Sequence, residues 1–407
     1  MQLFINASLI LEDRIEENGY LVEEQGRILA FGPMSAAQTW AKKAGSTIDC
    51  RHQYLSPGFV DIHTHGSGGF DYMDGTVEAF EQAAKAHLRY GATTILPTTL
   101  ASTDKHLYQT LDVFKQASAL TEGMPHLPGL HLEGPYFSPL EKGAMEMKHL
   151  RLPDERHYLP VVEYAEGLIR RWSLAPELEG ALAMADKLVP MGIHLSAAHT
   201  AATYEQMSEA FDHGINHLTH FYSAMSTITR RNGFRILGVV ESGYLIDGLT
   251  LEVIADGMHL PPALLRLVYQ AKKSEQICAC TDSMRAAGLP EGPSILGPME
   301  GGTAVIVEDG IAKMPDRSCF AGSVATCDRM VRVLMRDAGL SLWEAVRASS
   351  LLPASFMGLG DVTGSIVVGK QADLLVFDRD ISIERVFVSG KEVQPGGWPN
   401  QEPEEKV

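Results

Sequence analysis

The segment "ELEGALAMADKLVPMGIHLSAAHT", residues 177–200, contains the alternation that decides the fold. Residues 177–192 have the apolar spacing of a helix and end on Gly192, a residue type common just past helix ends. Residues 193–200 form a short apolar run that is typical of a buried strand. A helix that leads directly into a strand is the repeating unit of α/β folds.

The same unit recurs along the middle of the chain. Helical patterns precede strand-like runs in three further places, at residues 77–91 before 92–100, 202–214 before 215–221, and 261–273 before 276–283. Units of this length, repeated over about 300 residues, predict an α/β protein with a (β/α)₈ barrel of the TIM-barrel type. A doubly wound open sheet is the alternative, but no glycine-rich phosphate fingerprint follows a strand.

The two ends of the chain have a different rhythm from the middle. Residues 1–57 and 363–407 carry short alternating apolar runs separated by glycine-containing turns, which indicate β-strands. We therefore expect a small β-sandwich domain built from both termini. Residues 58–362 are expected to form the barrel.

Composition narrows the possible partners of the chain. Its 407 residues carry a net charge of −17, which disfavours binding to a nucleic-acid backbone or an anionic membrane. Five cysteines do not make a disulfide framework, and there is neither an apolar run long enough for a membrane span nor a secretory leader pattern. We expect a cytoplasmic protein with neither nucleic-acid nor membrane partners.

Ligand-type side chains stand where the predicted strands end. They are His63, His65, Glu133, His199, His220 and Asp282. In a barrel, the C-terminal ends of the strands meet at one mouth, so these side chains should converge there. Buried carboxylates and imidazoles without partners are costly, and a divalent metal ion would supply the partner.

The spacing and type of these residues favour a catalytic metal centre. His63 and His65 are two residues apart in a strand, so both can face one ion. Nitrogen and oxygen ligands without cysteine suit Zn²⁺ most, with Fe²⁺ or Mn²⁺ as alternatives. A single histidine in a strand is more often structural, and we assign that role to His131, His194 and His217.

Several motifs together resemble the amidohydrolase superfamily, and more narrowly the N-acetylglucosamine-6-phosphate deacetylases. The resemblance covers nearly the whole chain. It rests on "PGFVDIHTHG" (57–66), "HLEGPYFSPLEKGA" (131–144), "LAPE" (174–177), "AAHTAATYEQ" (197–206), "THFYSAM" (219–225), "ADGMHL" (255–260), "CTDSM" (280–284) and "AGSVATCDRMVR" (321–332).

The resemblance implies how the ligands are shared between one or two metal ions. His63, His65 and Asp282 would hold a first ion. Glu133 would share it with a second ion held by His199 and His220. The resemblance also implies a homodimer.

The implied reaction is hydrolysis of an acetamide. A metal lowers the pKa of its bound water to about 7, and the hydroxide attacks the carbonyl carbon. Asp282 would take the proton from that water and pass it to the leaving amine. The favoured substrate is N-acetylglucosamine 6-phosphate, giving the amino sugar phosphate and acetate. Alternatives are N-acetylgalactosamine 6-phosphate, an unphosphorylated acetamido sugar, a cyclic amide, a dipeptide or an aminopurine, or a catalytically silent barrel.

The residues expected to contact substrate depart from the family pattern. Met145 stands where the family usually has histidine, and Ser223 where it has asparagine. Arg231 falls at the family arginine that grips phosphate, often across a dimer interface, but its flanking histidine and glutamate are missing. These differences leave the identity of the substrate open. The substrate-binding residues implied by the resemblance are Gly134, Ala144, Met145, Ser223, Ala224, Arg231 and His259.

Overall fold

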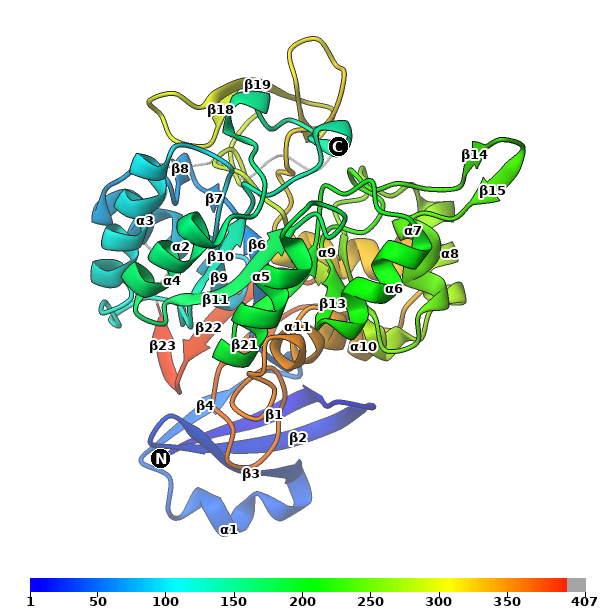
Figure 1. Cartoon of the computed structure of the whole chain (residues 1–407). Helices are drawn as coiled ribbons and strands as arrows, with labels where there is room; N and C mark the ends of the chain where they lie inside the picture. The colour runs from blue at the N-terminus through cyan, green and yellow to red at the C-terminus, as the bar shows by residue number, and fades with distance from the viewer. Residues whose placement is uncertain (394–407) are drawn as a thin grey trace.

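The computed structural model describes residues 1–393, and its centre is a barrel of eight parallel strands (Figure 1). The barrel confirms the predicted α/β fold. Its ring closes where the backbone N–H of Asp282 donates to the carbonyl of His63 at 2.9 Å. In spatial order the strands are β17 (Ile277–Cys280), β16 (Thr250–Ile254), β13 (Ile215–Leu218), β12 (His194–Ala197), β11 (Ile169–Leu174), β10 (Leu130–Glu133), β9 (Ala92–Thr99) and β6 (Phe59–Thr64).

Helices surround the barrel and bury their apolar faces against it. Side-chain caps begin several of them, as where the Thr76 hydroxyl accepts from the Ala79 N–H at 3.1 Å. The helices are α2 (Val77–Leu88), α3 (Asp104–Ala117), α4 (Glu155–Ala165), α5 (Ala181–Leu188), α6 (Tyr204–Asp212), α7 (Val239–Leu245), α8 (Pro262–Ala271), α9 (Cys327–Val333), α10 (Leu342–Ala348) and α11 (Leu351–Phe356).

Helix α5 is shorter than the helix expected over residues 177–192. Residues 177–180 precede it because the Glu177 carboxylate accepts hydrogen bonds from the Thr200 hydroxyl at 2.6 Å and the Ala201 N–H at 2.7 Å. These contacts tie the segment to the loop after β12. A 3₁₀ helix over Val189–Met191 follows α5, and Gly192 closes it with φ 84°, as the sequence predicts for a closing glycine.

Both ends of the chain pair in a separate sheet below the barrel (Figure 1), as expected. Strand β5 joins the two ends by pairing with β1 on one side and β21 on the other. Along β2, Leu21 packs in one apolar cluster, while Tyr20 and Val22 pack in another on the opposite face. The strands are β1 (Gln2–Ile10), β2 (Ile15–Glu24), β3 (Arg27–Pro33), β4 (Ser46–Asp49), β5 (Tyr54–Pro57), β21 (Leu374–Phe377), β22 (Ile383–Val388) and β23 (Lys391–Val393), and α1 (Gln38–Ala41) lies beside them.

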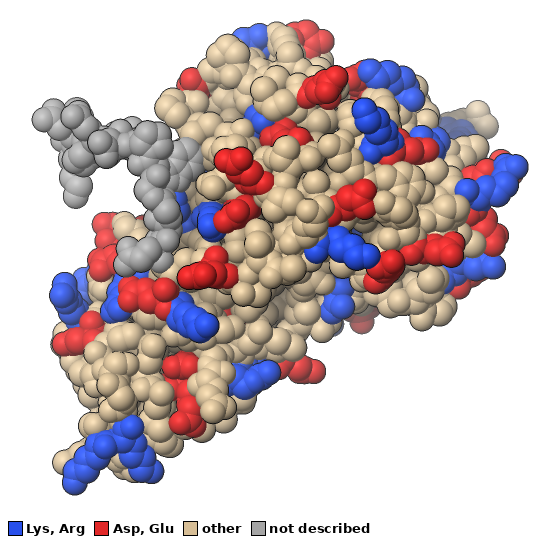
Figure 2. Space-filling model, turned by 90° about the vertical axis from the view of Figure 1, so that its left-hand side faces the viewer, with Lys and Arg blue, Asp and Glu red and all other residues tan. Residues whose placement is uncertain are grey.

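The domain limits 1–57, 58–362 and 363–407 stay predictions, and residues 394–407 lie outside the described part of the chain. Within residues 1–393, no helix combines the length and hydropathy of a membrane span. On the face that Figure 2 shows, acidic and basic side chains are interspersed rather than gathered into one basic patch.

Short strands surround the mouth of the barrel, at the end opposite the sheet formed by the two chain termini (the terminal sheet; Figure 1). The hairpin of β14 (Thr229–Arg231) and β15 (Phe234–Ile236) projects away from the body of the molecule. The others are β7 (Gly66–Ser67) with β8 (Phe70–Asp71), and a three-stranded sheet of β18 (Gly292–Leu296), β19 (Thr303–Glu308) and β20 (Ile311–Lys313). These additions leave the C-terminal ends of the barrel strands as the floor of a cavity.

Candidate metal centre

The two histidines at the end of β6 both turn one ring nitrogen toward the barrel mouth. The Nδ1 atom of His63 lies 2.7 Å from Glu252 Oε1, and the Nδ1 atom of His65 lies 3.2 Å from the carbonyl oxygen of Thr98. With Nδ1 engaged on each ring, Nε2 is the nitrogen left to face the centre. Period-two geometry therefore places both imidazoles on one side, as the sequence predicts.

Asp282 follows β17 and completes a first cluster with these histidines. Its Oδ1 atom lies 3.4 Å from His63 Nε2 and 3.2 Å from His65 Nε2. One ligand atom from each of the three residues lies within 4.8 Å of the others. All three side chains are buried.

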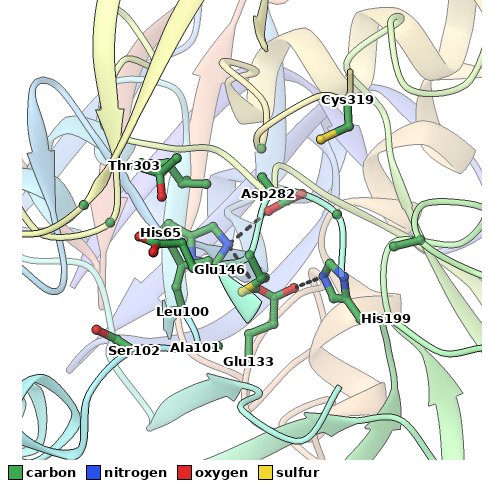
Figure 3. A pocket seen from close by; sticks show the side chains of 18 of the residues that line it. His65, Leu100, Ala101, Ser102, Glu133, Glu146, His199, Asp282, Thr303 and Cys319 are labelled. Atoms are coloured by element: carbon green, nitrogen blue, oxygen red, sulfur yellow. Dashed lines mark ion pairs between the residues drawn. The ribbon is translucent and has the colours of Figure 1, made fainter. Parts of the chain in front are cut away.

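Glu133, at the end of β10, lies between this cluster and a second one (Figure 3). Its Oε1 atom is 3.1 Å from His220 Nε2, 3.4 Å from His199 Nε2 and 3.6 Å from His63 Nε2. Its Oε2 atom is 3.4 Å from His65 Nε2. Glu133, His199 and His220 form the second group of mutually close ligand atoms. The structure thus brings together all six residues that the sequence singled out.

Three of the six residues have a left-handed backbone. His199, His220 and Asp282 have φ values of 46°, 33° and 46°. A non-glycine residue in this region costs on the order of 1–3 kcal/mol, and such residues concentrate at functional sites. Each of the three residues lies two positions beyond the end of its strand, and its side chain belongs to one of the two groups of ligand atoms.

The chemistry of the cluster fits a divalent cation. The Nε2 atom of His63 is buried without a hydrogen-bond partner. The Nε2 atoms of His199 and His220 lie only 3.2 Å apart. Buried polar atoms in this arrangement call for a shared positive partner.

The charge states of Glu133 and Asp282 are also those that ligands of a divalent cation require. Burial raises the pKa of Glu133, but the surrounding histidines, His63 foremost, hold it well below its ordinary value. Burial also raises the pKa of Asp282, and His63 and His65 again lower it overall. Both groups are therefore carboxylates near neutral pH, as metal ligands must be.

A cavity of about 250 Å³ opens above the cluster. His65, Glu133, His199, His220 and Asp282 form its floor. No lysine or arginine is among the lining residues within the described chain. Its upper wall comes from β18, β19 and the loop that follows β20.

The predicted substrate-binding residues divide into two groups. Five of them line the cavity, namely Ala144, Met145, Ser223, Ala224 and His259. Gly134 does not line it, and its carbonyl instead accepts from the Trp172 indole N–H at 2.8 Å. Arg231 lies exposed on the β14–β15 hairpin and is outside the lining.

The histidines assigned a structural role lie outside the cavity lining. The ring of His131 is hydrogen-bonded at both nitrogens, through Nε2 to the Ser173 hydroxyl at 2.6 Å and through Nδ1 to the Thr98 hydroxyl at 3.2 Å. His217 contacts the Thr250 hydroxyl at 2.7 Å. His194 lies at the start of β12, toward the opposite end of the barrel.

Sequence reasoning missed two acidic residues that contact site residues. Asp256 accepts from Nδ1 of His259 at 2.8 Å and also from the His259 backbone N–H at 2.9 Å. Glu252 lies beneath His63. The signal for Asp256 was its place in "ADGMHL", three residues before His259. Glu252 sits inside an apolar strand and offered no comparable signal.

Known proteins resemble this chain in both sequence and architecture. The Amidohydrolase family model matches residues 54–393. N-acetylgalactosamine-6-phosphate deacetylase of Escherichia coli O157:H7 is 30% identical over 377 residues, covering 93% of this chain and 96% of that protein. N-acetylglucosamine-6-phosphate deacetylase of Bacillus subtilis (strain 168) is 30% identical over 384 residues, covering 94% of each.

A solved structure agrees with the sequence relatives. A variant of N-acetyl-D-glucosamine-6-phosphate deacetylase from Mycobacterium smegmatis, in complex with N-acetyl-D-glucosamine-6-phosphate, superposes with a TM-score of 0.86 at 30% identity. The superposition covers 96% of this chain and 99% of the other. The chain therefore belongs to the amidohydrolase family and is a hydrolytic enzyme that acts on an amide bond.

Proposed function

We propose that this enzyme removes the acetyl group from N-acetylglucosamine 6-phosphate, releasing acetate and the amino sugar phosphate. The proposal depends on the position of Glu133. Its Oε1 atom lies 3.1 to 3.6 Å from the Nε2 atoms of three histidines, each at the end of a different barrel strand, namely His220, His199 and His63. This arrangement stands beneath a cavity large enough for a small ligand. The choice of substrate follows relatives that have this named activity and are 30% identical over almost the whole chain.

We propose that His63, His65, Asp282, Glu133, His199 and His220 hold one or two divalent ions. When bound, a divalent cation polarises the amide carbonyl and activates water for attack on the carbonyl carbon. Histidine and carboxylate ligands favour Zn²⁺, and Fe²⁺ or Mn²⁺ accept the same set.

Asp282 and His259 would carry the proton chemistry and the orientation of the substrate. Asp282 would take the proton from the attacking water and deliver it to the amide nitrogen, so that the C–N bond breaks and the nitrogen leaves as a neutral amine. His259 lines the cavity, and its Nδ1 atom is held by Asp256, so Nε2 is the ring nitrogen available to a substrate oxygen. Ser223 and Met145 contribute the neighbouring wall.

A homodimer, a cytoplasmic location and the domain limits given above belong to this proposal. The exposed β14–β15 hairpin carries Arg230, Arg231 and Arg235 and supports the dimer, because the cavity lining contains no arginine or lysine of the described chain. A phosphate group prefers the paired hydrogen bonds of an arginine.

The test is acetate release from a panel of substrates by the purified full-length enzyme. N-acetylglucosamine 6-phosphate should give the highest kcat/KM, and removal of metal by a chelator should abolish turnover until Zn²⁺ is restored. A preference for N-acetylgalactosamine 6-phosphate would favour the second candidate, which the Escherichia coli relative supports. Release of acetate from none of the acetylated sugars by metal-loaded enzyme would contradict both.

A further inference from the structure

A fully buried carboxylate lies directly beneath the predicted metal centre. Glu252 comes from β16, and its Oε1 atom lies 2.7 Å from Nδ1 of His63. The same oxygen accepts from the backbone N–H of His220 at 3.1 Å. One oxygen atom therefore contacts a residue of each of the two ligand groups.

The other oxygen of Glu252 is held by an equally buried arginine. Nη1 of Arg171 donates to Glu252 Oε2 at 2.6 Å. The guanidinium is itself fixed from several strands, because it also donates to the Ser196 hydroxyl at 3.0 Å, the Thr219 hydroxyl at 2.8 Å and the carbonyl of Ile62 at 3.2 Å. A planar donor held at this many points leaves the carboxylate little freedom to rotate.

These contacts determine which ring nitrogen of His63 carries the proton. The guanidinium of Arg171 and the backbone N–H of His220 can only donate, so Glu252 accepts at both oxygens. Nδ1 of His63 must then be the protonated nitrogen that donates to Oε1. When an ion is bound, Nε2 is therefore the nitrogen whose lone pair would be available to it, on the side of Glu133 and Asp282, which lie 3.6 Å and 3.4 Å away.

We propose that Glu252 is a positioning residue that sets the tautomer and orientation of His63 and anchors the turn that carries His220. Arg171 keeps Glu252 in place. The inference rests on the proposed metal centre. Glu252 would hold His63 and the turn of His220 in the geometry that binds an ion, before the ion is present. A carboxylate that orients a ligating histidine typically changes metal affinity by roughly 10- to 100-fold when it is removed.

The substitution Glu252→Gln reverses the hydrogen bond to His63. The amide oxygen of glutamine would face Arg171, which can only donate, so the amide NH₂ would face His63 Nδ1 and could no longer accept from the His220 N–H. The ring would then accept at Nδ1 and carry its proton on Nε2, where the ion is to bind. Glu252→Asp keeps the charge and both acceptors and should recover part of the affinity.

Metal affinity is the readout, measured by competition with a chromophoric chelator for Zn²⁺ on the full-length protein. Glu252→Gln should bind the ion at His63 roughly 10- to 100-fold more weakly than wild type. The matched control is Asp373→Asn, which alters another buried carboxylate that accepts from the Thr363 hydroxyl at 2.8 Å and the Ser389 N–H at 2.8 Å. Asp373 lies by the terminal sheet, so this variant should lower the melting temperature and leave Zn²⁺ affinity unchanged.

A measurement on the wild type covers the case in which Glu252→Gln does not fold. Histidine ¹⁵N NMR of the Zn²⁺-loaded enzyme should show His63 bound through Nε2 with a protected proton on Nδ1. Coordination through Nδ1, wild-type affinity in Glu252→Gln, or equal loss in Asp373→Asn would overturn the inference. Wild type that binds Zn²⁺ but releases no acetate would contradict only the proposed function.

Discussion

Asp282→Asn tests the proposed proton transfer most directly. The side chain is buried, and its Oδ1 atom lies 3.2 Å from His65 Nε2 and 3.4 Å from His63 Nε2. Asparagine has the same shape and keeps an oxygen that can ligate a metal, but it cannot accept the proton of the attacking water. The substitution therefore separates ligand geometry from base chemistry.

The expected loss can be stated as a rate. A positioned general acid or base contributes about 10²- to 10⁴-fold to turnover. At 1.36 kcal/mol for each factor of ten, this raises the barrier by about 3 to 5 kcal/mol. Since the floor of the cavity keeps its shape, we expect the loss in kcat and little change in KM.

The assay combines acetate release with metal content measured on the same sample. Asp373→Asn is the control for loss of a buried carboxylate away from the cavity, and it should turn over normally below its melting temperature. If Asp282→Asn binds the same amount of metal and keeps kcat within tenfold of wild type, Asp282 is not the proton carrier.

Two further predictions concern substrate contacts. Burial lowers the pKa of His259, but the hydrogen bond and charge of Asp256 raise it overall above its ordinary value of 6.5. Asp256→Asn removes the negative charge that raises the pKa of His259, so the imidazolium loses its proton at lower pH. The alkaline limb of the kcat/KM profile should therefore move to lower pH. An unmoved limb would exclude protonated His259 as a hydrogen-bond donor to the substrate. Arg231→Ala should raise KM for phosphorylated sugars much more than for the unphosphorylated sugars, with Arg27→Ala on the terminal sheet as control. Equal effects on both substrate classes would show that Arg231 does not bind phosphate.

The order of the barrel elements and the six ligand-type residues could be predicted because both follow from local rules. Apolar spacing distinguishes helix from strand, and parallel strands in a barrel end at one mouth. Helix ends were less predictable. The shortening of α5 at its N-terminal end depends on Glu177, whose partners Thr200 and Ala201 lie beyond the next strand.

By itself, the sequence determined that a barrel would form and which side chains would gather at its mouth, because these depend on periodicity and strand direction. Only the tertiary structure decided which other groups touch them. Glu252 reaches His63 across 189 positions, and Arg171 reaches Glu252 across 81. It also placed Gly134 and Arg231 off the cavity. Contacts between distant segments depend on how strands tilt and side chains pack, which no local pattern encodes.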